Sequence, residues 1–108
     1  MRVYQKIVIP EGNKKHLFSK HEIRSIKSDR YYANVFCENK KILVRITLKK
    51  LEELLPRNFI RISKSVIINS LFVIRIEASK ASCCVVLSGE IQYQVTDKYK
   101  SQFHHYFS

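Results

Sequence analysis

The stretch TLKKLEELLPRNFIRISKSVIIN, residues 47–69, holds the clearest helix of the chain and leads directly into its most strand-like run. Four leucines recur there at three- and four-residue spacing, at Leu48, Leu51, Leu54 and Leu55. This spacing predicts an amphipathic helix with one apolar stripe, which Thr47 caps and Pro56 ends. Because two helical turns are unstable alone, we expect the helix to pack on a sheet.

Bulky apolar residues alternate with basic or small polar ones for most of residues 57–77, and residues 59–69 are rich in Ile and Val. The alternation predicts strand structure with four side chains in the core, at Ile60, Ile62, Val66 and Ile68. A core strand needs none of the basic residues in this run. We expect Arg61 to brace the strand in a half-buried ion pair with Glu52 or Glu53. Lys64 is expected to project from a bend toward a negatively charged partner.

Further short apolar runs extend in both directions, the first of them over residues 3–9. They are separated by turn segments, at PEGNKK (10–15), SDR (28–30), ENKK (38–41), ASKASC (78–83) and Ser88-Gly89. The count is eight to ten short strands and one short helix, which predicts a mainly β domain. In the last segment Tyr99, Phe103 and Phe107 recur at four-residue spacing, which indicates a helical turn or an aromatic plug.

The chain has 108 residues, of which 45% are hydrophobic, enough for one packed domain over residues 1–108. Twenty Lys and Arg oppose nine Asp and Glu, giving a formal net charge of +11. Folding does not require this excess, and self-repulsion opposes the compact state. The charge therefore favours a polyanionic partner (DNA, RNA or an acidic membrane surface) over a merely soluble basic protein.

The basic residues fall into clusters at expected loops and strand ends, over residues 24–30, 40–41, 49–50, 57–64 and 98–100. Arg and Lys on loops held by a rigid sheet can reach phosphates and base edges. A solvated polar face is the alternative for any single cluster. Lys40-Lys41 and Lys49-Lys50 fit that alternative well.

No catalytic or metal-binding pattern is present in the sequence. With two glycines, no GxSxG and no phosphate-binding glycine loop, we expect no enzymatic activity and no cofactor. The three cysteines form no CxxC pattern, and His104-His105 falls in a terminal segment, so we expect buried reduced thiols and no metal site. Without a signal peptide or an apolar run of about 20 residues, the chain is expected in the cytoplasm.

Residues 47–69 closely resemble the central signature of LytTR-type bacterial DNA-binding domains, the output domains of LytR/AlgR response regulators. That signature has a Thr-Leu start, a short helix ending near Pro, an aromatic-x-Arg segment, a polar or basic residue with Ser, and an apolar run closing on Asn. Here these elements are Thr47-Leu48, Leu51 to Leu55, Phe59-Ile60-Arg61-Ile62, Ser63-Lys64-Ser65 and Val66 to Asn69. The resemblance extends to HEIRSIKSDRYYANV (21–35) and VVLSGEIQYQVTDKYKSQF (85–103), and so covers nearly the whole chain.

The resemblance implies an elongated stack of small antiparallel β-sheets with little helix. It also implies that loops grip double-stranded DNA in successive major grooves on one side of the duplex. The residues that it assigns to three DNA-binding loops are Arg30, Tyr31 and Tyr32, then Ser63, Lys64 and Ser65, and finally Thr96 and Lys98. Lys64 stands at the usual base-reading position.

Two positions depart from the pattern of the family. Ser63-Lys64 stands where His followed by Arg or Asn is more common, and Lys64 keeps a donor without the planar guanidinium, so we expect less exacting readout. Asp97 stands where the family usually has Arg. A carboxylate repels phosphate but can accept a hydrogen bond from a cytosine amino group, and we expect Lys98 to take over the phosphate contact.

We therefore expect a sequence-specific transcription regulator that binds double-stranded DNA at paired repeat sites, with a homodimer forming on DNA. No membrane and no small-molecule substrate are expected. The receiver domain usual in two-component regulators is absent from the sequence, so the chain is expected to act alone or to belong to a longer protein. Asp97 and that absence support a second hypothesis, a LytTR-like module that binds another protein and antagonises a related regulator. An RNA-binding domain comes third, because the strands lack the aromatic–glycine pattern for base stacking.

Overall fold

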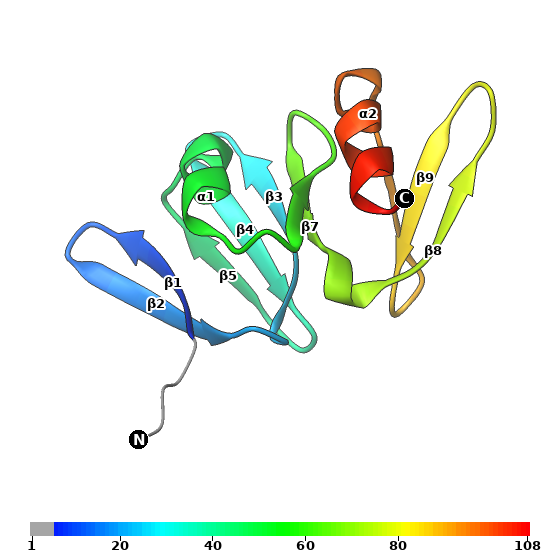
Figure 1. Ribbon diagram of the computed structural model, residues 1–108. Helices are drawn as coiled ribbons and strands as arrows, with labels where there is room; N and C mark the ends of the chain where they lie inside the picture. Colours follow the sequence, from blue (N-terminus) through cyan, green and yellow to red (C-terminus); the bar gives the residue numbers. More distant parts are fainter. Residues whose placement is uncertain (1–5) are drawn as a thin grey trace.

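The computed structural model describes residues 6–108 (Figure 1). Its ten strands are β1 Lys6–Glu11, β2 Lys14–Ser19, β3 Ile23–Asp29, β4 Tyr32–Cys37, β5 Lys41–Val44, β6 Phe59–Arg61, β7 Val66–Asn69, β8 Val73–Ala78, β9 Cys83–Leu87 and β10 Ile91–Gln94. Two α-helices, α1 Leu48–Leu54 and α2 Asp97–Tyr106, and one 3-10 turn, η1 Ser70–Phe72, complete the described part.

The strands form three antiparallel sheets that follow one another across the molecule (Figure 1). The hairpin β1-β2 is the first, the five-stranded sheet in the order β5-β4-β3-β7-β6 is the second, and the order β10-β9-β8 makes the third. Helix α1 contacts β1 and β6, and α2 contacts β6 from the side of the third sheet (Figure 1). The mainly β prediction and the stack of small sheets are confirmed.

Two hydrophobic cores lie on either side of β7. Ile67 belongs to the core beneath α1, together with Leu48 and Leu51. Val66 and Ile68 face the other way, into the core that α2 closes with Phe103. Because β7 is buried on both faces, its sequence is a continuous apolar run rather than an alternating one. The strand therefore joins the two halves of the molecule.

The helix predicted from the leucine spacing is confirmed, with its expected cap. The side chain of Thr47 accepts a hydrogen bond from the Lys50 N–H at 3.1 Å. The four expected core side chains of the following run are all buried, at Ile60, Ile62, Val66 and Ile68. The three cysteines are free thiols, with Cys37 and Cys83 buried and Cys84 partly so.

Two expectations about elements are wrong. Residues 59–69 form two antiparallel strands, β6 and β7, because the chain reverses between Arg61 and Val66. The last segment is a ten-residue helix rather than a single turn, so the fold has two helices instead of one. The aromatic spacing that signalled this segment packs Phe103 and Phe107 against the second core. The first strand begins at Lys6 among the described residues, and the rest of its expected range lies outside them.

Candidate nucleic-acid interface

The loop between β6 and β7, residues 62–65, has all four of its carbonyl oxygens occupied by donors from the protein. The Thr96 N–H donates to the Ile62 oxygen at 3.0 Å, and the Ser28 N–H donates to the Ser65 oxygen at 2.9 Å. Arg61 supplies the other two bonds, from Nε to the Ser63 oxygen at 2.8 Å and from Nη2 to the Lys64 oxygen at 2.6 Å. The loop is therefore fixed from β3, β6 and the start of α2.

This arrangement leaves the loop rich in donors. The Ser65 N–H donates to Ser63 Oγ at 3.2 Å, while the N–H groups of Ser63 and Lys64 find no acceptor within residues 6–108. The Lys64 side chain is exposed, whereas Ser63 is buried and Ser65 half-buried. A loop whose carbonyls are used internally, and in which the Ser63 and Lys64 amides and the Lys64 ammonium are free, is suited to an anion.

Arg61 braces this loop, as the sequence indicated. Its Nη1 donates to Glu52 Oε1 at 2.6 Å, while Glu53 pairs with Lys50 instead. Its side chain is only 12% exposed, and its guanidinium lies 5.7 Å from the ring centroid of Tyr99. Arg61 thus ties α1, the β6–β7 loop and α2 together and is not available to a ligand.

The first turn of α2 carries the third group of predicted residues. Thr96 is the N-cap and is exposed, although its side chain makes no capping hydrogen bond. Asp97 is 96% exposed and pairs with Lys100 at 2.9 Å. A carboxylate in the first turn also interacts favourably with the helix dipole, so Asp97 has a role within the helix. Lys98 is exposed beside it, with Nζ 5.6 Å from the Tyr99 ring centroid.

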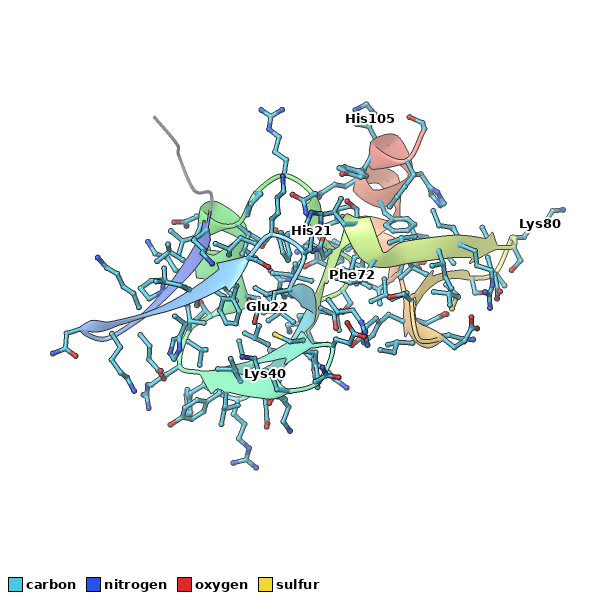
Figure 2. All side chains as sticks on the ribbon, turned by 90° about the horizontal axis from the view of Figure 1, so that it is seen from below. His21, Glu22, Lys40, Phe72, Lys80 and His105 are labelled. Atoms are coloured by element: carbon cyan, nitrogen blue, oxygen red, sulfur yellow. The ribbon has the colours of Figure 1, made fainter. Side chains whose placement is uncertain are left out.

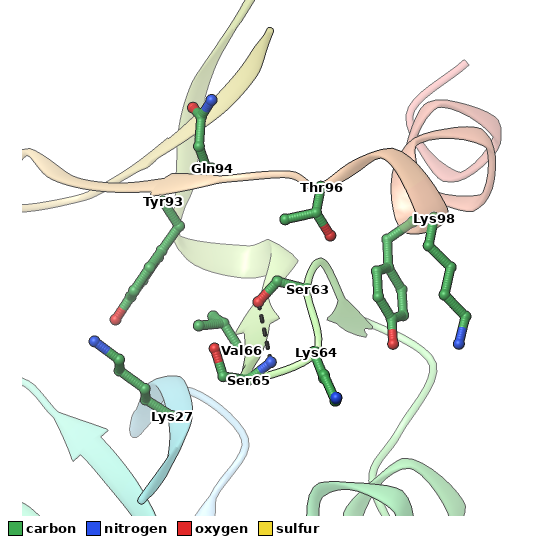
Figure 3. Close-up of a pocket in the computed structure, with 10 residues that line it drawn as sticks. Lys27, Ser63, Lys64, Ser65, Val66, Tyr93, Gln94, Thr96 and Lys98 are labelled. Atoms are coloured by element: carbon green, nitrogen blue, oxygen red, sulfur yellow. Dashed lines mark hydrogen bonds between the residues drawn. The ribbon is translucent and has the colours of Figure 1, made fainter.

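The second and third groups of predicted residues line one hollow of about 660 Å³. Its walls are Lys27, Ser63, Lys64, Ser65, Val66, Tyr93, Gln94, Thr96, Lys98 and Tyr99. Figure 3 shows Lys64 and Lys98 on one side of this hollow and Lys27 on the other, with Tyr93 above Lys27. Three lysines from three separate elements therefore surround one solvent-filled depression.

The first group, on the β3–β4 turn, lies next to this hollow. The turn follows Ser28, whose N–H bonds the β6–β7 loop. Arg30 is exposed, Tyr31 is 73% exposed, and Tyr32 is half-buried at the start of β4. The turn, the β6–β7 loop and the start of α2 all stand along the upper side of Figure 1. Arg30, Lys64 and Lys98 are thus carried at one end of the molecule.

The basic cluster Lys40-Lys41 lies at the other end. Figure 2 views that end from below, where Lys40 pairs with Glu22 at 3.6 Å. Lys50 pairs with Glu53 at 3.5 Å on α1. For Lys40 and Lys50 the interpretation as solvated, paired surface charges fits the structure.

Several residues that lie beside the predicted site residues were missed in the sequence. Tyr93 and Gln94 line the hollow from β10, and the Tyr93 hydroxyl bonds Ser25 Oγ at 3.0 Å, which joins the second and third sheets. Lys27 was noticed only as part of a basic cluster. Arg45, after β5, lies with its guanidinium 5.7 Å from the Tyr31 ring and 5.9 Å from the Tyr32 ring. No signal in the sequence joins these positions, since strand pairing and the contact between the second and third sheets bring them together.

Within residues 6–108, no three His, Cys, Asp or Glu side chains come together as metal ligands. Neither described helix has the length and apolar character needed to cross a membrane.

The fold and the loops define a class of small, strongly basic, mainly β domains that gather positive side chains from two loops and the first turn of a helix at one end. The chain belongs to the LytTR DNA-binding domain family, whose model matches residues 13–108. DNA binding and transcription regulation are therefore the functions of its family, and the resemblance seen in residues 47–69 is confirmed.

A solved structure supports the fold independently. The LytTr DNA-binding domain of a response regulator from Bacillus cereus superposes with a TM-score of 0.81 and 17% sequence identity. The match covers 95% of this chain and 96% of that one. No curated protein matches the sequence.

Proposed function

We propose that the chain is a sequence-specific regulator that reads double-stranded DNA in successive major grooves, with loop residues rather than with a recognition helix. Lys64 reads base edges from the β6–β7 loop, while Ser63 and Ser65 keep the backbone near phosphates. Arg30, Tyr31 and Tyr32 enter the neighbouring groove. Thr96 and Lys98 contact the backbone from the start of α2. Two copies occupy paired repeat sites as a dimer on DNA.

The observation that carries this proposal is the convergence of Arg30, Lys64 and Lys98 at one end of a braced β scaffold. Their elements are connected by the Ser28 and Thr96 bonds to the β6–β7 loop, so the backbone segments that carry the three side chains are fixed relative to one another. A backbone that is fixed before binding lowers the entropy cost of matching these positive side chains to the spacing of a duplex.

The role of Lys64 is tested by selecting duplexes from a random library and comparing Lys64→Ala with the parent on the selected site and on random DNA. We expect the variant to lose about 1–3 kcal/mol of discrimination between the two. Lys20→Ala is the matched control, because Lys20 is exposed at the opposite end of β3. If Lys64→Ala keeps the full preference of the parent, Lys64 does not read bases.

One observation that supported the protein-interaction hypothesis, the carboxylate of Asp97, has another explanation. Asp97 pairs with Lys100 and stabilises the first turn of α2, so its presence does not require a partner other than DNA. Failure of the parent to retard any duplex at low salt would restore that hypothesis.

A further inference from the structure

Arg45 occupies a position that none of the three predicted loops includes. It follows β5, is exposed, and faces the β3–β4 turn, where its guanidinium lies against Tyr31 and Tyr32. Together with Arg30, Tyr31, Ile46 and Thr47 it lines a second hollow of about 300 Å³. This hollow adjoins the turn that carries the first group of predicted DNA contacts.

The guanidinium of Arg45 is uncommitted, in contrast to those of two other arginines. The guanidinium of Arg61 donates to Glu52 and to two carbonyl oxygens. That of Arg75 pairs with Glu77 at 2.7 Å and with Glu90 at 3.0 Å. No carboxylate or carbonyl within residues 6–108 accepts from the Arg45 side chain. Aromatic rings hold its planar group in place without using its N–H donors, which stay free for a bidentate anion.

The backbone of Arg45 is fixed from the β1–β2 hairpin. Its N–H donates to Glu11 Oε2 at 2.8 Å, and the other carboxylate oxygen of Glu11 lies 2.9 Å from His16 Nε2. Glu11 therefore connects the first sheet to the end of β5. By accepting a hydrogen bond from the Arg45 N–H, Glu11 fixes the backbone of Arg45 and can thereby set the direction of the Arg45 side chain.

We propose that Arg45 is a fourth DNA contact, which binds a backbone phosphate beside the β3–β4 turn, and that Glu11 is the residue that positions it. The inference rests on the proposed DNA-binding function. A duplex that meets Arg30 passes the second hollow, where a phosphate finds a preorganised guanidinium rather than a mobile lysine. The contact gives affinity and register but no base preference.

The test is the salt dependence of binding to a selected duplex, by fluorescence anisotropy, for the parent chain and for Arg45→Ala. Losing one phosphate contact should make the slope of log affinity against log salt concentration less steep by about 0.9. Preference for the selected site over random DNA should remain. Arg57→Ala is the matched control, because Arg57 is an exposed arginine that precedes β6, away from the β6–β7 loop.

The positioning role of Glu11 has a test of its own. Removing a negative charge should by itself tighten DNA binding, whereas losing the positioning bond should weaken it. We expect Glu11→Ala to bind more weakly than the parent, and Glu11→Gln to restore affinity because its amide oxygen still accepts from the Arg45 N–H. In the Arg45→Ala background, Glu11→Ala should no longer weaken binding, because only the loss of a negative charge remains.

The outcomes separate this inference from the proposed function. If the parent binds no duplex, the proposed function fails. If the parent binds and Lys64→Ala loses discrimination, but Arg45→Ala keeps the slope of the parent, Arg45 is not a phosphate contact. Tighter binding by Glu11→Ala would overturn the positioning role.

Discussion

Two hairpins of the molecule share one turn geometry and differ in the residue at its most restricted position. In the β1–β2 hairpin, Gly12 has a φ of +61° and the flanking pair is Glu11 with Lys14. In the β3–β4 hairpin, Arg30 has a φ of +60° between Asp29 and Tyr32. Both two-residue turns have a positive φ at the first position only, where hairpins of type II′ usually have glycine.

The residue at the positive-φ position, Gly12 in one turn and Arg30 in the other, indicates a different role for each turn. An L-residue with a side chain pays about 1–2 kcal/mol in the left-handed region, and glycine does not. The Arg30 side chain is exposed and takes part in no hydrogen bond or ion pair within residues 6–108. The β1–β2 turn therefore has the residue that folding favours, whereas the β3–β4 turn keeps a positive charge at the expense of stability. This is the expectation for a binding residue.

The largest expected effect comes from Arg30→Gly, which makes the two turns alike. We expect the affinity for a selected duplex to fall by about 1–3 kcal/mol, because a groove contact is lost. The free energy of unfolding should rise by about 1 kcal/mol, because the left-handed residue becomes glycine. Anisotropy and urea denaturation measure the two. A variant that is less stable than the parent would show that Arg30 serves the fold.

The reverse change, Gly12→Ala, should affect stability alone. A Cβ built on Gly12 meets no atom within 4 Å, so the cost is that of the positive φ, about 1–2 kcal/mol in the free energy of unfolding. DNA affinity should match that of the parent, measured under the same conditions. Weaker DNA binding by this variant would bring the β1–β2 turn into the interface and remove the contrast.

The stability of the fold in acid tests Glu11, at the turn end of the β1–β2 hairpin. The hydrogen bond from His16, together with that from the Arg45 N–H, lowers the pKa of Glu11 below its ordinary value of 4.5. A depressed carboxyl pKa stabilises the fold above that value and ceases to do so as the pH falls through the lower, folded-state pKa. The melting temperature of Glu11→Gln should thus lie below that of the parent at pH 6, and the two should converge in acid. A gap that is constant with pH would contradict this.

The smallest expected effect is the difference in DNA affinity between Arg30→Gly alone and the exchange of the two residues in one chain, Arg30→Gly with Gly12→Arg. Net charge is unchanged, so any difference from the parent reports position rather than total charge. We expect its DNA affinity to equal that of Arg30→Gly alone, by anisotropy at two salt concentrations. Recovery of parental affinity would mean that charge anywhere on the molecule suffices.

Much of the fold could be predicted from local pattern. The leucine spacing with Thr47 and Pro56 marked α1, and the pattern of residues 59–69 predicted strand structure with Ile60, Ile62, Val66 and Ile68 in the core. The reversal between β6 and β7 was missed, although three consecutive polar residues, Ser63, Lys64 and Ser65, interrupt the alternation there. Arg61 and backbone bonds from distant elements turn the chain at this point. Helix α2 was underestimated because only Phe103 of its residues is buried, which leaves a weak periodic signal.

The candidate site divides in the same way. The positions of Lys64 and Lys98 followed from the family resemblance, and the ion pair of Arg61 followed from its apolar neighbours. Arg45 and Tyr93 could not be found, since they join the site only through β4–β5 pairing and the contact between the second and third sheets. The strain at Arg30 is equally invisible in sequence, because arginine gives no sign of a positive φ.

The most direct test of the central claim, that one basic end of the β scaffold meets DNA, is the change in backbone amide NMR shifts when a selected duplex is added. We predict that the large changes fall on the β3–β4 turn, the residues after β5, the β6–β7 loop and the first turn of α2. The β4–β5 turn with Lys40 and the β1–β2 turn with Gly12 should stay unchanged. Changes centred on those two turns, with none at Lys64, would contradict the account.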